Sequence, residues 1–118
     1  MSKVVNQAEQ QLREALTQAA GRAVAADELP AEPMPAFTVE IPGDRAHGDL
    51  AANAAMVSAR AFRQPPRKIA ETLLRHLELS GTYLERAEVA GPGFLNFFLS
   101  PAYYAAVVAD ILEQGEDY

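Results

Sequence analysis

The feature that most constrains the fold is the run Val89–Ser100, V-A-G-P-G-F-L-N-F-F-L-S. Gly91-Pro92-Gly93 predicts a tight turn, because glycine reaches positive φ freely and proline presets its own φ near about −65°. Phe94–Leu99 has the composition and length of a β-strand. Residues 83–90 are expected to be its partner strand, so the run predicts a β-hairpin.

Period-2 alternation divides this strand into two faces. One face has the composition of a core and carries Leu95, Phe97 and Leu99. The other face places an amide between two aromatic rings and carries Phe94, Asn96 and Phe98. A buried asparagine needs hydrogen-bond partners, so Asn96 is expected either to be exposed or to bind something. Phe98 shares this face by parity, but it lies farther along the strand and we expect it to belong to the core.

Composition narrows the class of protein. A chain of 118 residues that is 49% hydrophobic suits one domain, residues 1–118, with one core. The absence of cysteine excludes disulfides, thiolate metal sites and a cysteine nucleophile. No apolar run approaches the roughly 18 residues of a membrane span, and no signal peptide is visible. We therefore expect a soluble, cytoplasmic domain.

The charge of the chain is unevenly distributed. The net charge of −6 argues against an autonomous nucleic-acid binder, because phosphate contacts dominate such affinity. Residues 45–75 nevertheless carry six basic and two acidic residues, whereas both flanking segments are acidic. Four of the basic side chains lie within nine residues that contain no acid: Arg60, Arg63, Arg67 and Lys68. This stretch is either a solvated junction between helices or a patch that faces phosphate.

Periodicity predicts secondary structure on both sides of the basic stretch. Apolar residues at spacings of three and four predict a helix over residues 3–26, and residues 27–35, with three prolines and three acids, predict a connector. Alternation over residues 36–41 predicts a strand whose buried side carries Phe37, Val39 and Ile41. A helix is expected over residues 50–62, capped by Asp49, with a buried side made of Leu50, Ala54, Val57 and Ala61.

The C-terminal half adds two helices. Pro66 is well placed at the first position of a helix that continues over residues 67–79. Ser100-Pro101 begins a last helix that ends near Gln114, with an apolar stripe made of Tyr104, Val107, Val108, Ile111 and Leu112. Together the elements predict the α+β class, with a small, mainly antiparallel sheet of about three or four strands packed with about four helices.

The sequence lacks the common motifs of catalytic sites. No phosphate-binding glycine loop, nucleophile elbow or H-E-x-x-H zinc motif is present. His47 has Asp44 and Asp49 nearby, but without further ligands it is expected to be a loop residue, and no metal site is predicted. Asn53 follows Asp49 by one helical turn and either ties the loop to the helix or contacts a ligand. His76 lies in the helix over residues 67–79, beside its Leu73/Leu77 stripe, and is expected to be a boundary residue of that stripe. The residues indicate a recognition or packing module.

Three stretches together resemble a known family. They are V-E-I-P at Val39–Pro42 leading to H-G-D-L-A-A-N-A-A-M at His47–Met56, P-R-K-I-A-E at Pro66–Glu71, and the run Val89–Ser100. Their order and spacing resemble the N-terminal additional domain of bacterial-type arginyl-tRNA synthetase, over essentially the whole chain. Ala52 stands where the family often has threonine or serine.

The resemblance implies a place within a larger enzyme. Enzymes of this family join arginine to its tRNA using ATP with Mg²⁺, in a class I catalytic domain whose HIGH-like and KMSK-like signatures are absent from this chain. This chain alone is therefore expected to bind no cofactor and to be inactive. Its expected partners are arginine tRNA and the catalytic domain of the same polypeptide, with no membrane and no DNA.

The resemblance also implies a site. In the family, an aromatic and an amide residue after the glycine turn recognise the D-loop nucleotide at position 20 of the tRNA. On this sequence they are Phe94 and Asn96, with Gly91 and Gly93 in the turn, and a wider tRNA-binding set adds Arg63, Arg67, Lys68 and Asn53. A phenylalanine ring can stack on a splayed base, and an asparagine amide offers both a donor and an acceptor to its edge. The alternative is a protein–protein or interdomain docking module with no direct RNA contact.

Overall fold

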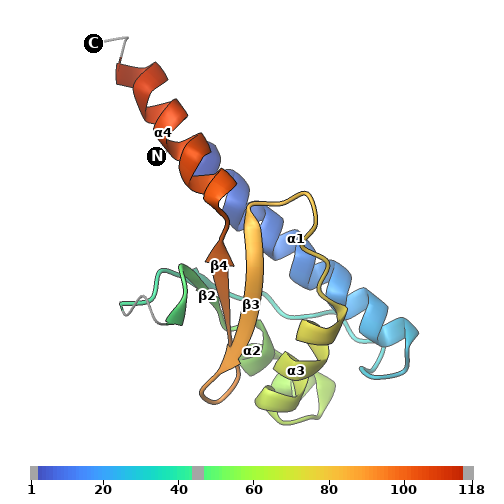
Figure 1. Ribbon diagram of the computed structural model, residues 1–118. Helices are drawn as coiled ribbons and strands as arrows, with labels where there is room; N and C mark the ends of the chain where they lie inside the picture. The colour runs from blue at the N-terminus through green and yellow to red at the C-terminus, as the bar shows by residue number, and fades with distance from the viewer. Residues whose placement is uncertain (1–2, 44–46, 116–118) are drawn as a thin grey trace.

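The computed structural model describes residues 3–43 and 47–115. Its elements follow one another as α1 (Lys3–Ala25), β1 (Val39–Glu40), β2 (Leu50–Ala52), α2 (Ala54–Phe62), α3 (Pro66–His76), β3 (Leu84–Ala90), β4 (Phe94–Leu99) and α4 (Pro101–Gly115) (Figure 1). Four helices and a four-stranded antiparallel sheet confirm the α+β prediction. None of the helices in the described ranges is long and apolar enough to cross a bilayer.

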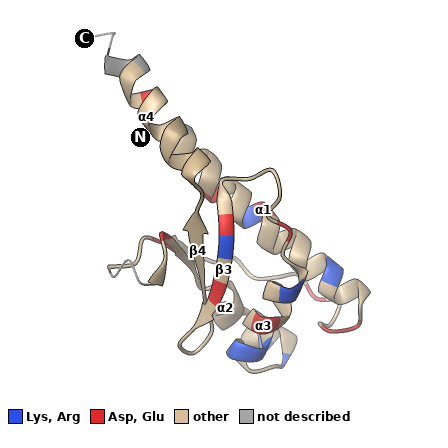
Figure 2. Ribbon diagram, viewed as in Figure 1, with Lys and Arg blue, Asp and Glu red and all other residues tan. Residues whose placement is uncertain are grey.

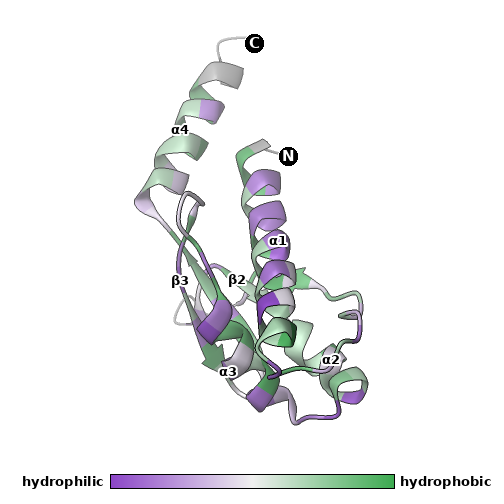
Figure 3. Cartoon of the chain, turned by 90° about the vertical axis from the view of Figure 1, so that its right-hand side faces the viewer, coloured by the Kyte–Doolittle hydropathy of each residue, from purple (hydrophilic) through white to green (hydrophobic). Residues whose placement is uncertain are grey.

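The sheet has the strand order β1-β2-β4-β3, and every neighbouring pair is antiparallel. The predicted hairpin is the pair β3 and β4, with Ala90 opposite Phe94. Strand β4 is central, because β2 pairs with its other edge and places Leu50 opposite Phe97. Helices α1, α2 and α3 lie on one face of the sheet, and no helix in the described part covers the other (Figures 1 and 3). We call the uncovered face the outer face.

The core lies between the sheet and the three helices. The predicted stripe of α1 is buried, and its fully or nearly buried members are Ala8, Leu12, Ala15, Leu16, Ala19 and Ala23. The sheet contributes Leu95 and Phe97, which are fully buried, as the two-face prediction for this strand requires. The buried alanines of α1 allow this helix to pack close to its neighbours, which leaves no space for large side chains on the helix itself. The aromatic rings of the core therefore come from the sheet and from Phe62.

The prediction of one helix over residues 50–62 was wrong at its start. Leu50–Ala52 forms β2, and the helix begins only at Ala54. Alanine has high helix propensity, but these residues hydrogen-bond to β1 on one side and to β4 on the other. If residues 50–52 were helical, one edge of β4 would lack a neighbouring strand, and its backbone N–H and C=O groups would be left unpaired. Pairing with β2 satisfies these groups.

Asp49 does not cap a helix, so this prediction was also wrong. One of its carboxylate oxygens accepts a hydrogen bond from the Leu99 amide at 2.9 Å, and the other accepts one from the Tyr104 hydroxyl at 2.9 Å. Asp49 thereby joins the loop before β2 to the end of β4 and the first turn of α4. Burial, and next the charge of Asp49, raise the pKa of the neighbouring Tyr103 above its usual value.

Three burial patterns differ from those predicted. Helix α2 buries Ala54, Ala55, Ser58 and Phe62, so its buried side is rotated from the prediction and Val57 is exposed. Strand β1 is only two residues long, and Ile41, which lies beyond it, is 80% exposed. Helix α3 ends at His76 and not at residue 79, since Leu77 has extended backbone angles.

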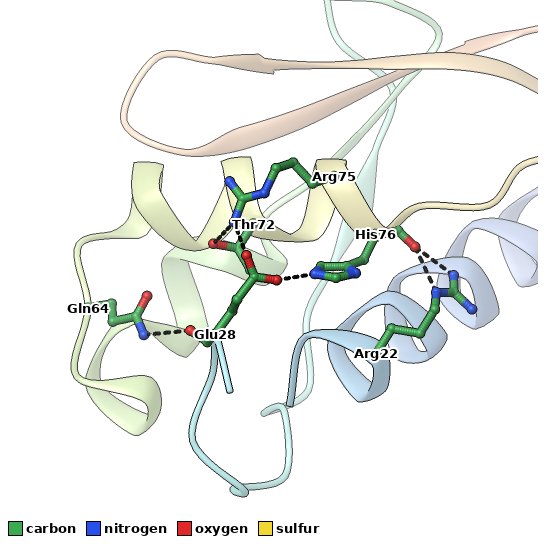
Figure 4. A network of polar contacts seen from close by, with 6 residues as sticks. All are labelled: Arg22, Glu28, Gln64, Thr72, Arg75 and His76. Atoms are coloured by element: carbon green, nitrogen blue, oxygen red, sulfur yellow. Dashed lines mark hydrogen bonds and ion pairs between the residues drawn. The ribbon is translucent and has the colours of Figure 1, made fainter. Parts of the chain in front are cut away.

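A polar network ties the connector after α1 to the C-terminal end of α3 (Figure 4). The carboxylate of Glu28 contacts the guanidinium of Arg75 and Nε2 of His76. The carbonyl oxygen of His76 accepts two hydrogen bonds from Arg22, at 2.6 and 2.9 Å, and Gln64 donates to the carbonyl oxygen of Glu28 at 3.0 Å. The partly buried side chain of His76 suits the boundary residue that was expected, and its place as the last residue of α3, where it holds the connector, was not predicted.

Helix α4 extends beyond the sheet beside the N-terminal end of α1 (Figures 1 and 3). Its predicted apolar stripe exists, but within the described residues no other element covers most of it. Tyr104, Val108, Ile111 and Leu112 are between 45% and 65% exposed. Exposed apolar side chains along one helix face are typical of an interface with another protein surface.

Candidate functional site

The strand register builds one row of side chains across the outer face. Glu40 lies opposite Ala51, Ala51 lies opposite Asn96, and Asn96 lies opposite Glu88. Residues that are directly opposite in an antiparallel pair point to the same side of the sheet. Asn96 therefore lies in the middle of the sheet, with a carboxylate on each flank. The small Ala51 between Asn96 and Glu40 leaves space above the strand.

A hollow of about 440 Å³ occupies this space beside the hairpin turn. It is lined by Glu40, Pro42, Gly43, His47, Ala51, Ala90, Gly91, Pro92, Phe94 and Asn96. Four of the residues predicted or weighed as functional from sequence thus lie together: the turn glycine Gly91, Phe94, Asn96 and His47. A concave site of mixed apolar and polar lining suits a flat ligand such as a nucleobase.

A second hollow, of about 560 Å³, lies between α1 and the connector and contains none of the predicted tRNA-binding residues. Its lining includes Arg13 and Phe37, and Arg13 already donates a hydrogen bond to the Phe37 carbonyl oxygen at 3.0 Å while lying over the ring. Because that cation is held by local partners, this hollow offers less chemistry than the one on the outer face.

Asn96 is the most informative residue of the site. Its side chain belongs to a residue that is only 4% exposed, yet its amide makes no side-chain hydrogen bond to any of the described residues. The amide atoms are not among the fully buried atoms that lack a partner, so they are reached from the hollow. The amide lines the hollow with a free donor and a free acceptor, next to the half-buried ring of Phe94.

The turn between β3 and β4 is fixed by close packing against α3. Gly93 has φ of +137°, and a Cβ atom there would lie 2.9 Å from the carbonyl carbon of Pro66, so only glycine fits. Gly91 also has positive φ, at +55°, and its carbonyl oxygen accepts a hydrogen bond from Nη1 of Arg67 at 2.8 Å. Of the two glycines predicted from the sequence, Gly91 therefore lines the hollow, whereas Gly93 does not and packs the turn against α3.

The basic stretch lies where α2 ends and α3 begins, next to this turn (Figure 2). Arg67 is directed to the turn and also pairs with Glu71 at 3.8 Å, so it positions the hairpin. Arg63 ends α2 in the left-handed conformation with φ of +55°, and it is exposed, as is Lys68. Neither Arg63 nor Lys68 has an acidic partner within 4 Å among residues 3–43 and 47–115.

Asn53, the last member of the predicted set, has a structural partner. Its Oδ1 accepts a hydrogen bond from the Thr38 amide at 2.8 Å, and it does not line the hollow. Asn53 thus ties the segment before β1 to the start of α2, whereas the notion that it shares a helix face with Asp49 was wrong. His47 is exposed at the edge of the hollow, and no group of three metal-ligating side chains occurs among the described residues.

The expectation that Phe98 belongs to the core was wrong. The side chains of the core do not include it, and it is half-buried on the outer face. The guanidinium of Arg86, on the adjacent strand β3, lies 3.6 Å from the centre of its ring. The alternation of inner and outer side chains along β4 therefore continues to Phe98, and the ring of Phe98 is covered by a cation and not by the core.

Sequence reasoning missed Glu40 and Ala51, which stand beside Asn96 in the row. Both were hidden by the incorrect helix over residues 50–62, since a helix at Ala51 removes the strand that brings Glu40 near Asn96. The available signal was Gly48, which has φ of +90° and whose Cβ would lie 2.9 Å from the Phe97 carbonyl oxygen. A glycine two residues before a short apolar triplet is compatible with close approach of two strands.

Comparison with known proteins finds relatives that all belong to one family. The family model described as "Arginyl tRNA synthetase N terminal domain" matches residues 6–99. An arginine–tRNA ligase of Acetivibrio thermocellus is 38% identical over 118 residues, which is 100% of this chain and 21% of the relative. One from Geobacillus thermodenitrificans is 43% identical over 117 residues, or 98% of this chain and 20% of the relative. The chain thus spans about a fifth of the length of these curated relatives.

Two solved structures share the fold. The arginyl-tRNA synthetase of Thermus thermophilus has a TM-score of 0.51 and 31% identity over 75% of this chain and 14% of its own. That of Plasmodium falciparum has a TM-score of 0.59 over 80% of this chain and 16% of its own. At 15% identity, the second shows a similar fold alone.

Proposed function

The chain belongs to the family of arginyl-tRNA synthetase N-terminal domains, and from that premise we propose that it recognises arginine tRNA through one unpaired base of the D-loop, at position 20. The hollow on the outer face takes the base. Phe94 stacks on its flat side, and the Asn96 amide hydrogen-bonds its edge. Within a longer synthetase this contact would serve the ATP-dependent joining of arginine to its tRNA, in the cytoplasm.

The observation that supports this proposal is the position of Asn96, whose amide lines the hollow and makes no side-chain hydrogen bond to the described residues. Because the amide is reached from the hollow, a ligand that enters can complete its hydrogen bonds. An aromatic ring beside an amide is also the combination by which proteins read unstacked RNA bases.

The exposed basic side chains beside the turn supply the phosphate contacts in this proposal. Arg63 and Lys68 have no acidic partner among the described residues, and Lys68 lies in the first turn of α3, two residues after the proline against which Gly93 packs. Phosphate contacts position an RNA without reading its sequence. Because the chain carries a net charge of −6, these contacts are expected to be few and the affinity strongly dependent on salt.

The test is a titration of the chain with arginine tRNA at low salt, for the wild type and for Phe94→Ala and Asn96→Ala. Loss of base stacking or of the edge contact is expected to weaken binding by about 1–3 kcal/mol, or roughly 5- to 150-fold. Replacing Arg63 or Lys68 by alanine is expected to lower the slope of log affinity against log salt by about 1 each.

The matched control is Asn6→Ala, which removes an exposed amide from α1, outside the hollow. It should leave affinity unchanged. Equal affinity of wild type, Phe94→Ala and Asn96→Ala would contradict the proposal. In that case the hollow would instead be an interdomain surface, and chemical shifts of the amides from 91 to 98 would not respond to tRNA.

A second role is favoured by α4. We propose that its exposed apolar side chains dock on another part of a longer synthetase polypeptide, because about four-fifths of each curated relative lies outside the matched region. This role uses a different element from the hollow, so the two roles are compatible.

Simultaneous replacement of Val108, Ile111 and Leu112 by serine tests this second role. The thermal stability of the 118-residue chain should change little, since these side chains are exposed. In a synthetase-length polypeptide, the same replacement should accelerate proteolysis at the junction that follows α4. An unchanged rate of cleavage would contradict docking.

A further inference from the structure

A second aromatic group occupies the outer face beyond the hollow. Phe98 lies on the same side of β4 as Phe94 and Asn96, four residues along the strand from Phe94. The guanidinium of Arg86, which is opposite Phe98 on β3, lies 3.6 Å from the centre of the ring. A guanidinium this close to a ring centre lies over its face, as in a cation–π pair.

The surroundings hold this guanidinium in place without hiding it. Arg86 pairs with Glu88 on its own strand, two residues along and on the same side of the sheet. Both side chains nevertheless remain 53% exposed. One flat side of the guanidinium is covered by Phe98, and no helix in the described ranges lies over this face. The outward side of a planar cation is therefore available on the outer face.

We propose that Arg86, supported by Phe98 and oriented by Glu88, is a second stacking platform for an unpaired nucleobase of the same RNA. Proteins stack unpaired bases on arginine planes as well as on aromatic rings. A guanidinium that is already stacked and paired loses less conformational freedom when a base binds than a free side chain does. This inference rests on the proposed function, because it assigns a second nucleotide to the RNA that occupies the hollow.

The spacing of the two platforms defines the kind of RNA. Four residues of strand place Phe94 and Phe98 about 13 Å apart. Bases within a regular helix are stacked on their neighbours and offer no free face to a platform, whatever their spacing. A ligand that reaches both platforms is therefore a loop whose bases are splayed apart.

The competing explanation is that Arg86 only shields the Phe98 ring from water, or that it attracts phosphate as a point charge. The variant Arg86→Lys distinguishes a stacking platform from a phosphate contact, since lysine keeps the positive charge and the pairing with Glu88 but lacks the planar guanidinium. A stacking platform is lost on Arg86→Lys, whereas a phosphate contact survives it.

The experiment titrates the 118-residue chain with an RNA stem-loop that carries the D-arm of arginine tRNA, at several salt concentrations. Arg86→Lys and Arg86→Ala should both weaken binding by about fivefold or more, and Phe98→Leu should weaken it in the same direction. The salt slope of Arg86→Lys should equal that of the wild type. Thermal unfolding of each variant establishes that it is folded.

The matched control is Arg13→Lys, because Arg13 also lies over a ring, that of Phe37, but away from the outer face. Its RNA affinity should not change. Wild-type affinity for Arg86→Lys would overturn the platform, as would unchanged affinity for Arg86→Ala. If Phe94→Ala and Asn96→Ala weaken binding in the same titration, such a result rejects the second platform alone. If these two variants also have no effect, the proposed function itself fails.

Discussion

The two faces of β4 place similar residues in very different surroundings. Leu95 and Phe97 face the helices and are fully buried in the core. Phe94 and Phe98, one residue away in each case, are half-buried on the outer face. Asn96 lies between them, buried but outside the core. The strand thus carries one phenylalanine in the core and two on the outer face.

The difference shows that alternate residues of one strand can serve different purposes: those on one face stabilise the fold, and those on the other are available for recognition. Side chains of the inner face lose apolar burial when truncated, so their replacement should act on the free energy of unfolding. On the outer face Phe94 and Phe98 are only half-buried and Asn96 lines the hollow, so replacement of these side chains should act mainly on binding. Substitutions at neighbouring positions should therefore give opposite profiles.

The largest expected effect is that of Phe97→Ala. Removing a ring that is fully buried between β2, β3 and the helices should lower the free energy of unfolding by about 3–5 kcal/mol. Denaturant unfolding followed by circular dichroism measures it. The comparison variant is Phe94→Ala, which should lower stability by about 1 kcal/mol or less. Similar losses for both variants would show that the two faces are not distinct.

Asn96→Leu is expected to separate binding from stability. Leucine has nearly the shape of asparagine, and the amide that it replaces is reached from the hollow and has no side-chain partner in the described part of the chain, so the free energy of unfolding should change by about 1 kcal/mol or less. Affinity for arginine tRNA should fall by about tenfold or more, because the base edge loses its partner. A less stable variant would indicate that the amide serves the fold.

The smallest expected effect is that of pH, and it should act on the helical side of the sheet alone. Hydrogen bonds from His76 and then from Arg75 lower the pKa of Glu28 below its ordinary 4.5. A carboxyl whose pKa is lower in the folded state stabilises the fold above its ordinary pKa and loses this contribution as the pH falls through the folded value.

Thermal unfolding at a series of pH values below about 4.5 measures this contribution. The loss should be small because Glu28 is exposed, and it should be reduced in Glu28→Gln. A variant with the same acid sensitivity as the wild type would assign that sensitivity to other carboxylates.

The sequence predicted well those elements whose signal is local. The hairpin follows from its glycine turn, and α1 and α4 follow from long apolar periodicity and, for α4, from a proline at its start. The inner and outer positions of β4 follow from alternation alone. The members of the hollow on β4 and its turn were therefore identified before the structure.

What escaped prediction depends on contacts between distant segments. Strand β2 is three residues of leucine and alanine, and only pairing with β1 and β4 makes it a strand. Its misassignment also hid Glu40 and gave Asp49 and Asn53 the wrong partners. For Arg67 the sequence left a solvated helix junction and a phosphate-facing patch as alternatives, and the hydrogen bond from its guanidinium to the Gly91 carbonyl oxygen is a contact that no sequence pattern indicates.

The central position of β4 has a consequence for the dynamics of the site. Both edges of Leu95–Phe97 are hydrogen-bonded, to β2 and to β3, so their amides should be among the slowest in the chain to exchange with solvent. The floor of the hollow is therefore a segment with a high free energy of local opening, in contrast to binding loops that are ordered only by their ligand. Little backbone entropy remains to be lost there when a ligand arrives.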